Sequence, residues 1–145
     1  AAGRALGMTE IRMTPDFEAF RRRMEPTIAL QLQGNSEPYL ELWSKKPDIM
    51  IFGALGGAEH GWPEVGSRLR WAATKVVARL VRVENLATVV QGTMALTADL
   101  EHMVRSVEGR EHERALRVTH GYRVEDGAWR IFYRHGDEYR PSGRS

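Results

Sequence analysis

The sequence predicts a single α+β domain in which helices come first and an antiparallel sheet follows. Before residue 77, apolar residues recur at helical spacing in three segments. After residue 77, apolar residues alternate with period two over four long segments, which short glycine-containing turns separate. Helices followed by consecutive hairpin-linked strands are typical of the α+β class.

The first helical segment opens at Thr14-Pro15-Asp16, where a capping hydroxyl, a proline at the first helical position and an acid in the first turn coincide. Pro26 lies inside the segment and should kink it, and Gly34 should end it. One apolar stripe follows the helical period and predicts the buried face: Phe17, Phe20, Met24 and Ile28.

The middle of the chain predicts two further helices around a glycine-rich turn region. Asn35 should cap a short helix over 36–44, and 48–53 is apolar enough for a buried strand. The glycines between residues 53 and 61 predict turns, because neither common phosphate-binding motif is present. Trp62-Pro63-Glu64 opens the third helix, whose apolar stripe is Val65, Leu69, Ala72, Ala73 and Val76.

Four long strands are expected at about 78–91, 94–107, 112–125 and 128–137. Asp126-Gly127 is a strong two-residue hairpin signal, and it sets the register of the last two strands. The implied partners are Val124 with Trp129, Tyr122 with Ile131, His120 with Tyr133, Val118 with His135, and Leu116 with Asp137. All of these side chains would then share one face, apolar near the turn and titratable at the other end, as a lined pocket requires.

The preceding hairpin turns near Glu108-Gly109-Arg110, and its loop length decides where two acids lie. A two-residue turn places Asp99 and Glu101 on the pocket face, close to His120. A three-residue loop or a bulge would reverse the faces and direct both acids toward the arginines of the other face. We favour the two-residue turn.

Composition narrows the function classes. The 145 residues are 42% hydrophobic and 28% charged, which is typical of one globular domain. The absence of cysteine excludes disulfides and thiolate metal sites and fits a cytoplasmic location. The net charge is +2 and the arginines are dispersed, so Arg21-Arg22-Arg23 is interpreted as a solvated helix face and no nucleic-acid partner is expected. No apolar run approaches the length of a membrane helix, so no membrane partner is expected either. We expect a flexible segment over 1–13, one domain over 14–139 and a frayed tail over 140–145.

Three segments together resemble SnoaL-like members of the nuclear transport factor 2-like superfamily: EPYLELWSKKPDIMIFGALGGAEHGWPEV, RLRWAA and RVTHGYRVEDGAWRIFYRHGD. The resemblance covers about residues 15–137. It implies a cone-shaped, cystatin-like roll of three N-terminal helices against a strongly bent, mostly antiparallel sheet, usually dimeric through the outer sheet face. The superfamily includes ketosteroid isomerases, polyketide cyclases, epoxide hydrolases, dehydratases and noncatalytic association domains, so the fold alone does not fix a function.

The resemblance also bears on the site. Positions that match Glu101 and His120 tend to point into the pocket in relatives. Ketosteroid isomerases carry their general base just after the first strand, where this chain has no carboxylate over 52–55. Polyketide cyclases use an acid with a histidine near the ends of late strands, and Asp137 is available with either His135 or His120.

The predicted pocket face and the resemblance together suggest a set of candidate catalytic and ligand-binding residues. His120 would be the general base or acid, Glu101 or Asp99 would orient it, and His135 with Asp137 would form a second proton-handling pair. The alternatives are a hydrogen-bonded interior histidine, acids in salt bridges with arginines, and a capped strand end. The candidate ligand-binding residues are aromatic, although each could instead belong to the core: Tyr39, Trp43, Phe52, Trp62, Trp71, Tyr122 and Tyr133. No metal or cofactor is expected, because no zinc-ligand spacing occurs.

The sequence therefore predicts a small-molecule pocket that performs cofactor-independent acid–base chemistry on a cyclic apolar substrate, as an isomerase, cyclase or hydrolase. The alternative is a noncatalytic ligand-binding or association module with the same fold. Catalysis requires an acid and a histidine within hydrogen-bond reach inside the pocket. The prediction of catalysis fails if His120 faces away from the helices or if an arginine holds every pocket acid.

Overall fold

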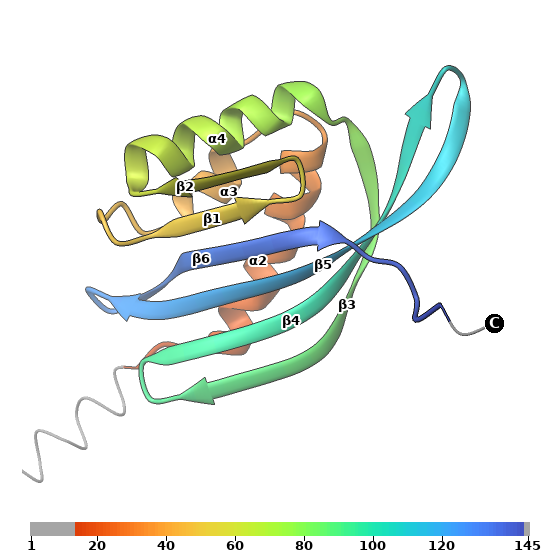
Figure 1. The fold of residues 1–145 in the computed structure, drawn as a ribbon. Helices are drawn as coiled ribbons and strands as arrows, with labels where there is room; N and C mark the ends of the chain where they lie inside the picture. Colours follow the sequence, from red (N-terminus) through yellow and green to blue (C-terminus); the bar gives the residue numbers. More distant parts are fainter. Residues whose placement is uncertain (1–13, 144–145) are drawn as a thin grey trace, which may run out of the picture.

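The structure is a computed structural model that describes residues 14–143. Its elements are α2 (Phe17–Leu32), α3 (Glu37–Glu41), β1 (Met50–Gly53), β2 (Gly56–His60), α4 (Trp62–Lys75), β3 (Ala78–Gln91), β4 (Met94–Val107), β5 (Arg110–Glu125) and β6 (Ala128–Glu138). The strands form one bent sheet in the order β2-β1-β6-β5-β4-β3, and the helices cover one face of it (Figure 1). This confirms the predicted α+β fold. The segment 1–13 and residues 144–145 of the expected tail lie outside the described residues.

Helix α2 buries the predicted stripe of four apolar residues against the sheet. Its N-cap is Asp16 rather than the predicted Thr14, because the Asp16 carboxylate accepts a hydrogen bond of 2.9 Å from the backbone N–H of Glu18. The helix continues through Pro26 and ends just before Gly34, whose φ of +96° suits a residue without a side chain. The α2 stripe forms the core together with Trp43, Tyr122, Trp129 and other buried apolar residues.

The middle of the chain differs from the prediction in two places. The short helix α3 spans only five residues, and its N-cap is Ser36 rather than Asn35. The glycine-rich stretch predicted as turns contains a strand, because Gly56 to His60 form β2 and pair antiparallel with β1. Glycines make poor strands on average, but this hairpin is held by backbone pairing and most of β2 is exposed. Strand β1 also pairs parallel to β6, which joins the hairpin to the sheet.

The turn between β4 and β5 has the predicted length of two residues. Glu108 and Gly109 have φ values of +52° and +76°, as a tight hairpin turn requires. The resulting register pairs Asp99 with Val118 and Glu101 with Leu116. Both acids therefore lie on the helix-covered face, so the favoured register is confirmed.

The register of β5 and β6 is correct only near the turn. Tyr122 faces Ile131 as predicted, but the next pairs are Gly121 with Tyr133 and His120 with Arg134. Phe132 is the additional residue of a β-bulge, and a shift by one residue exchanges the faces of every side chain beyond it. The predicted pocket-face positions of Tyr133, His135 and Asp137 are therefore wrong, and Arg134 enters the pocket face instead.

The bulge depends on Gly121, where an added Cβ would lie 3.0 Å from the Phe132 ring and 3.2 Å from the Tyr133 Cβ. We expect Gly121→Val to destabilise the fold by about 1–3 kcal/mol, since the ring or the strand must move. Urea denaturation measures the loss. The control is Thr93→Val, which changes the neighbouring turn at a position without a positive φ. Gly92→Val is unsuitable because Gly92 has a positive φ. An unchanged midpoint for Gly121→Val would contradict the role given to this glycine.

Candidate functional site

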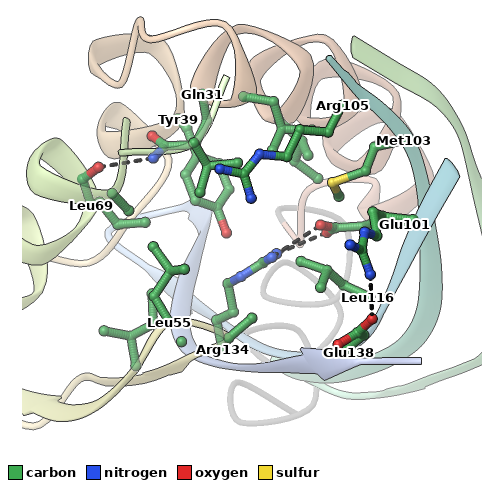
Figure 2. Close-up of a pocket in the computed structure, with 18 of the residues that line it drawn as sticks. Gln31, Tyr39, Leu55, Leu69, Glu101, Met103, Arg105, Leu116, Arg134 and Glu138 are labelled. Atoms are coloured by element: carbon green, nitrogen blue, oxygen red, sulfur yellow. Dashed lines mark hydrogen bonds and ion pairs between the residues drawn. The ribbon is translucent and has the colours of Figure 1, made fainter. Parts of the chain in front are cut away.

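A cavity of about 340 Å³ opens between the helices and the concave face of the sheet. Helices α2 and α4, the β1–β2 turn, and strands β4, β5 and β6 all contribute to its lining (Figure 2). The walls are mainly apolar: Ile28, Leu32, Ile51, Ala54, Leu55, Leu69, Ala72, Val76, Met103, Ala115 and Leu116. Polar lining groups are Gln31, Tyr39, Arg68, Glu101, Arg105, Arg114, Arg134 and Glu138.

A buried ion pair lies at the polar end of the cavity. The Arg134 guanidinium donates to both carboxylate oxygens of Glu101, over 2.8 and 3.0 Å, and the two side chains are 13% and 1% exposed. Burial alone would lower the pKa of Arg134, but Glu101 and Tyr39 beside it outweigh that effect and raise it. The bidentate geometry fixes both side chains at the cavity wall (Figure 2).

His120 lies directly behind this pair. Its Nε2 is 2.7 Å from the Tyr39 hydroxyl oxygen and 3.3 Å from Nη1 of Arg134. Burial, with the nearby charges of Arg134 and Arg21, lowers the pKa of His120 well below its usual value, so the ring is neutral. Burial also raises the pKa of Tyr39 to about 12, although Arg134 opposes the rise. His120 has no exposed surface, so it contacts the cavity only through Tyr39 and Arg134.

Asp99 belongs to a separate network between α2 and the sheet. Arg21 donates to both of its carboxylate oxygens over 3.0 Å, and the Asn85 amide donates to one of them over 2.8 Å. Arg21 also donates to the Tyr122 hydroxyl over 2.9 Å, and that hydroxyl lies 2.7 Å from the Thr97 hydroxyl. Asp99 thus anchors α2 and does not line the cavity.

The predicted pair His135 and Asp137 lies on the opposite face of the sheet. Asp137 accepts two hydrogen bonds from Arg117, over 2.9 and 2.7 Å, and these bonds hold the pKa of its carboxyl below the usual value. His135 pairs with Thr119 and packs edge-on against Phe52, with ring centroids 5.6 Å apart. Both residues border a hollow on the outer face, and neither reaches His120 or Glu101.

Most of the candidate ligand-binding aromatics also lie elsewhere, and only Tyr39 lines the cavity. Trp43 and Tyr122 are fully buried in the core. Phe52 and Tyr133 pack against each other on the outer face, with ring centroids 5.9 Å apart. Trp62 and Trp71 on α4 are covered by cations, Lys45 at 4.1 Å from one ring centroid and Arg68 at 4.0 Å from the other.

Arg134 is the site residue that the sequence argument placed on the wrong face. The available signal was Gly121, since an isolated glycine inside a strand often marks a bulge. The structure thus brings together Glu101, His120, Tyr39 and Arg134. Within residues 14–143, no cluster of three or more histidine, aspartate or glutamate side chains could hold a metal ion. No helix in the same range is both long and apolar enough to cross a membrane.

Comparison with known proteins supports the fold. A family model described as a SnoaL-like domain matches residues 21–136. No curated protein matches the sequence. A candidate calcium/calmodulin-dependent protein kinase type II association domain from Thiobacillus denitrificans is similar in structure, with a TM-score of 0.72, 18% identity, and coverage of 87% of this chain and 97% of that one.

Two further solved structures share the same architecture. A candidate dehydratase of the NTF2-like family from Streptomyces avermitilis has a TM-score of 0.61 and 14% identity, over 81% of this chain and 92% of that one. An NTF2-like protein with a cystatin-like fold from Novosphingobium aromaticivorans has a TM-score of 0.60 and 18% identity, over 85% and 84%. Identities this low show the fold alone. The family match extends over most of the chain, and the chain therefore belongs to the SnoaL-like domain family.

Proposed function

We propose that this protein binds a small organic molecule with a mostly apolar body in the cavity between its helices and sheet. The observation that carries the proposal is an apolar-walled cavity of about 340 Å³ with a paired polar cluster at one end. Small-molecule sites commonly have volumes of about 300–1,000 Å³, with apolar walls and a few polar groups that orient the ligand. The Glu101, Arg134 and Tyr39 side chains supply those polar groups.

Both buried acids, Glu101 and Asp99, are paired with arginines. This pairing supports ligand binding over acid–base catalysis by carboxylates. Glu101 and Asp99 are each held by two hydrogen bonds from an arginine, and each is almost completely buried. The oxygens of both carboxylates are therefore already engaged as hydrogen-bond acceptors. The acid and orienting roles predicted for these two residues therefore receive no support from their hydrogen bonds.

A second candidate function is proton transfer through Tyr39 and His120, which the 2.7 Å contact between them favours. Tyr39 reaches the cavity, so a substrate proton could pass through its hydroxyl to the neutral imidazole behind it. A test is exchange of α-hydrogens for deuterium in cyclic ketones. Exchange that Tyr39→Phe abolishes would support catalysis, and a wild-type rate equal to the buffer background would exclude this chemistry.

Binding is tested by a thermal-shift screen of cyclic alcohols, ketones, lactones and epoxides. A ligand present at about 100 times its Kd should raise Tm by about 5 °C or more. Ala72→Phe fills the cavity from α4 and should abolish the shift. Ala58→Phe on the exposed strand β2 is the matched control and should leave the shift unchanged. Shifts that survive Ala72→Phe would place the ligand outside the cavity.

We also propose that the protein forms a homodimer through the outer face of the sheet. Exposed apolar side chains gather near the β3–β4 turn: Leu86, Val89, Met94 and Leu96. Val89 pairs with Leu96, and Leu96 pairs with Gly121, so Val89 and Leu96 share the face opposite the cavity. Leu86 borders the hollow on the same face. Apolar surface of this kind is typical of protein interfaces. The similarity to a candidate association domain adds support.

Light scattering coupled to size exclusion tests the dimer. We expect the wild type to elute at twice the chain mass of 16.5 kDa. Leu96→Glu should give the monomer mass, because it places two like charges at a buried interface. Val77→Glu, at an exposed position before β3, is the control and should remain dimeric. A wild-type protein of monomer mass would contradict the proposal.

A further inference from the structure

Two polar groups converge on one nitrogen of His120, and one of them can only donate. The Tyr39 hydroxyl oxygen lies 2.7 Å from Nε2, and Nη1 of Arg134 lies 3.3 Å from the same atom. An arginine remains protonated in proteins, so Nη1 can only donate. Nε2 must then act as an acceptor, and in the neutral ring the proton resides on Nδ1.

The other tautomer is disfavoured at the same atom. A proton on Nε2 would point a ring N–H at a charged guanidinium N–H, inside a site from which solvent is excluded. In the Nδ1–H form, that N–H has no hydrogen-bond partner among the described residues. This cost opposes the preference but does not remove the donor-to-donor clash that the other tautomer has at Nε2. A doubly protonated ring would add a positive charge beside Arg134, which the lowered pKa of His120 also opposes.

This tautomer fixes what Tyr39 offers to a ligand. Because Nε2 is an acceptor, the Tyr39 hydroxyl donates its only proton to it. The Tyr39 oxygen points toward the cavity and Arg134 in Figure 2. One of its lone pairs accepts from Arg134, and the other is what it can present to a ligand in place of a proton. Arg134 has five N–H groups in all. The bonds to Glu101 and His120 use three of them, and the guanidinium also donates to the Tyr39 oxygen beside it.

We propose that the polar end of the cavity selects a neutral hydroxyl group, which donates to the Tyr39 oxygen and accepts from a remaining N–H of Arg134. This inference rests on the proposed ligand-binding function. A ketone can accept from Arg134 but leaves the Tyr39 lone pair without a donor. A carboxylate would face the Glu101 carboxylate and the Tyr39 oxygen, which are both acceptors. The preferred ligand is therefore an alcohol or a phenol with an apolar body.

The tautomer can be measured without any ligand. Long-range ¹⁵N–¹H correlation spectra of ¹⁵N-histidine-labelled protein distinguish the two neutral tautomers, and His120→Gln identifies the His120 signals by their loss. We expect the Nδ1–H form between pH 6 and pH 8. Signals of the Nε2–H form would overturn the inference.

The ligand preference is tested by calorimetry on matched alcohols and ketones: cyclohexanol with cyclohexanone, borneol with camphor, and 1-decalol with 1-decalone. For each matched pair that binds to the wild type, we expect the alcohol to bind about tenfold more tightly than the ketone. Tyr39→Phe removes the acceptor and should bring the two affinities close together. His120→Leu frees the Tyr39 proton and should reverse the preference toward the ketone. Circular dichroism establishes that each variant is folded.

The outcomes separate this inference from the proposed function. A wild-type preference for the ketones, or equal affinities, would overturn the hydroxyl selectivity while leaving ligand binding intact. Failure of every compound in the broader thermal-shift screen would contradict the proposed function. The tautomer measurement would then still decide the hydrogen-bond polarity of Tyr39.

Discussion

Replacing Arg134 by methionine is expected to destabilise the protein by about 3–5 kcal/mol, because the substitution leaves the Glu101 carboxylate buried without its partner. That carboxylate accepts two hydrogen bonds of 2.8 and 3.0 Å from the guanidinium, and its side chain is only 1% exposed. Neither His120 nor Tyr39 can replace a bidentate cation. Methionine preserves much of the volume, so the loss reports the charge rather than a cavity.

Urea denaturation measures the effect, with two comparisons. Arg117→Met removes the partner of Asp137 in an exposed pair, whose side chains are 62% and 45% exposed, and should cost far less stability than Arg134→Met. The double variant Glu101→Gln/Arg134→Met removes both charges and should recover much of the stability. A loss below about 1 kcal/mol for Arg134→Met would show that Glu101 reaches solvent or another cation.

The same pair bears on why the cavity is polar at one end. A buried ion pair is often no more stabilising than well-packed apolar residues of similar volume, because both charges lose their hydration. Stability alone therefore gives little reason for Glu101 and Arg134 at the wall of an otherwise apolar cavity. Ligand orientation gives a better reason, since the pair positions fixed donors and acceptors beside Tyr39.

The sequence predicted the features that local chemistry controls. Asp126-Gly127 and Glu108-Gly109 both form two-residue hairpin turns, whose positive φ values favour glycine at the second position. The Glu108-Gly109 turn length then placed Glu101 and Asp99 on the concave face, as expected. The α2 stripe was also predicted, because burial follows the helical period.

Features that depend on tertiary contacts were harder to predict. The bulge at Phe132 moves His135 and Asp137 to the outer face, and nothing in the alternation of β6 itself marks it. Aromatic residues were also hard to assign from the sequence, because they are typical both of a core and of the walls of an apolar pocket. Trp43 fills the core while Tyr39, four residues earlier, lines the cavity, and only the packing of α3 against the sheet distinguishes them.

The stability of the protein should fall as the pH drops below about 6.5, and much of that fall should depend on His120. Burial, with Arg134 and Arg21, lowers the pKa of this ring well below its usual value of 6.5. As the pH falls through that value, the unfolded chain binds a proton that the folded chain does not. The contribution is therefore fully present above about pH 6.5 and is lost at about 1.4 kcal/mol per pH unit, until the folded ring also titrates.

Comparison of pH series isolates this contribution from those of the other titrating groups. The difference in unfolding free energy between wild type and His120→Gln should shift in favour of the variant as the pH falls from 6.5 to 4.5, with a slope of at most about 1.4 kcal/mol per pH unit. Glutamine can still accept a hydrogen bond from Tyr39. At neutral pH, the variant should therefore lose less stability than it would if that hydrogen bond were absent. His102→Gln, whose ring is 26% exposed and bonded to Glu84, is the matched control and should follow the wild type more closely. A parallel pH dependence of wild type and His120→Gln would mean that the folded protein admits a proton at His120. That result would remove the neutral imidazole on which the hydrogen-bond polarity of Tyr39 depends.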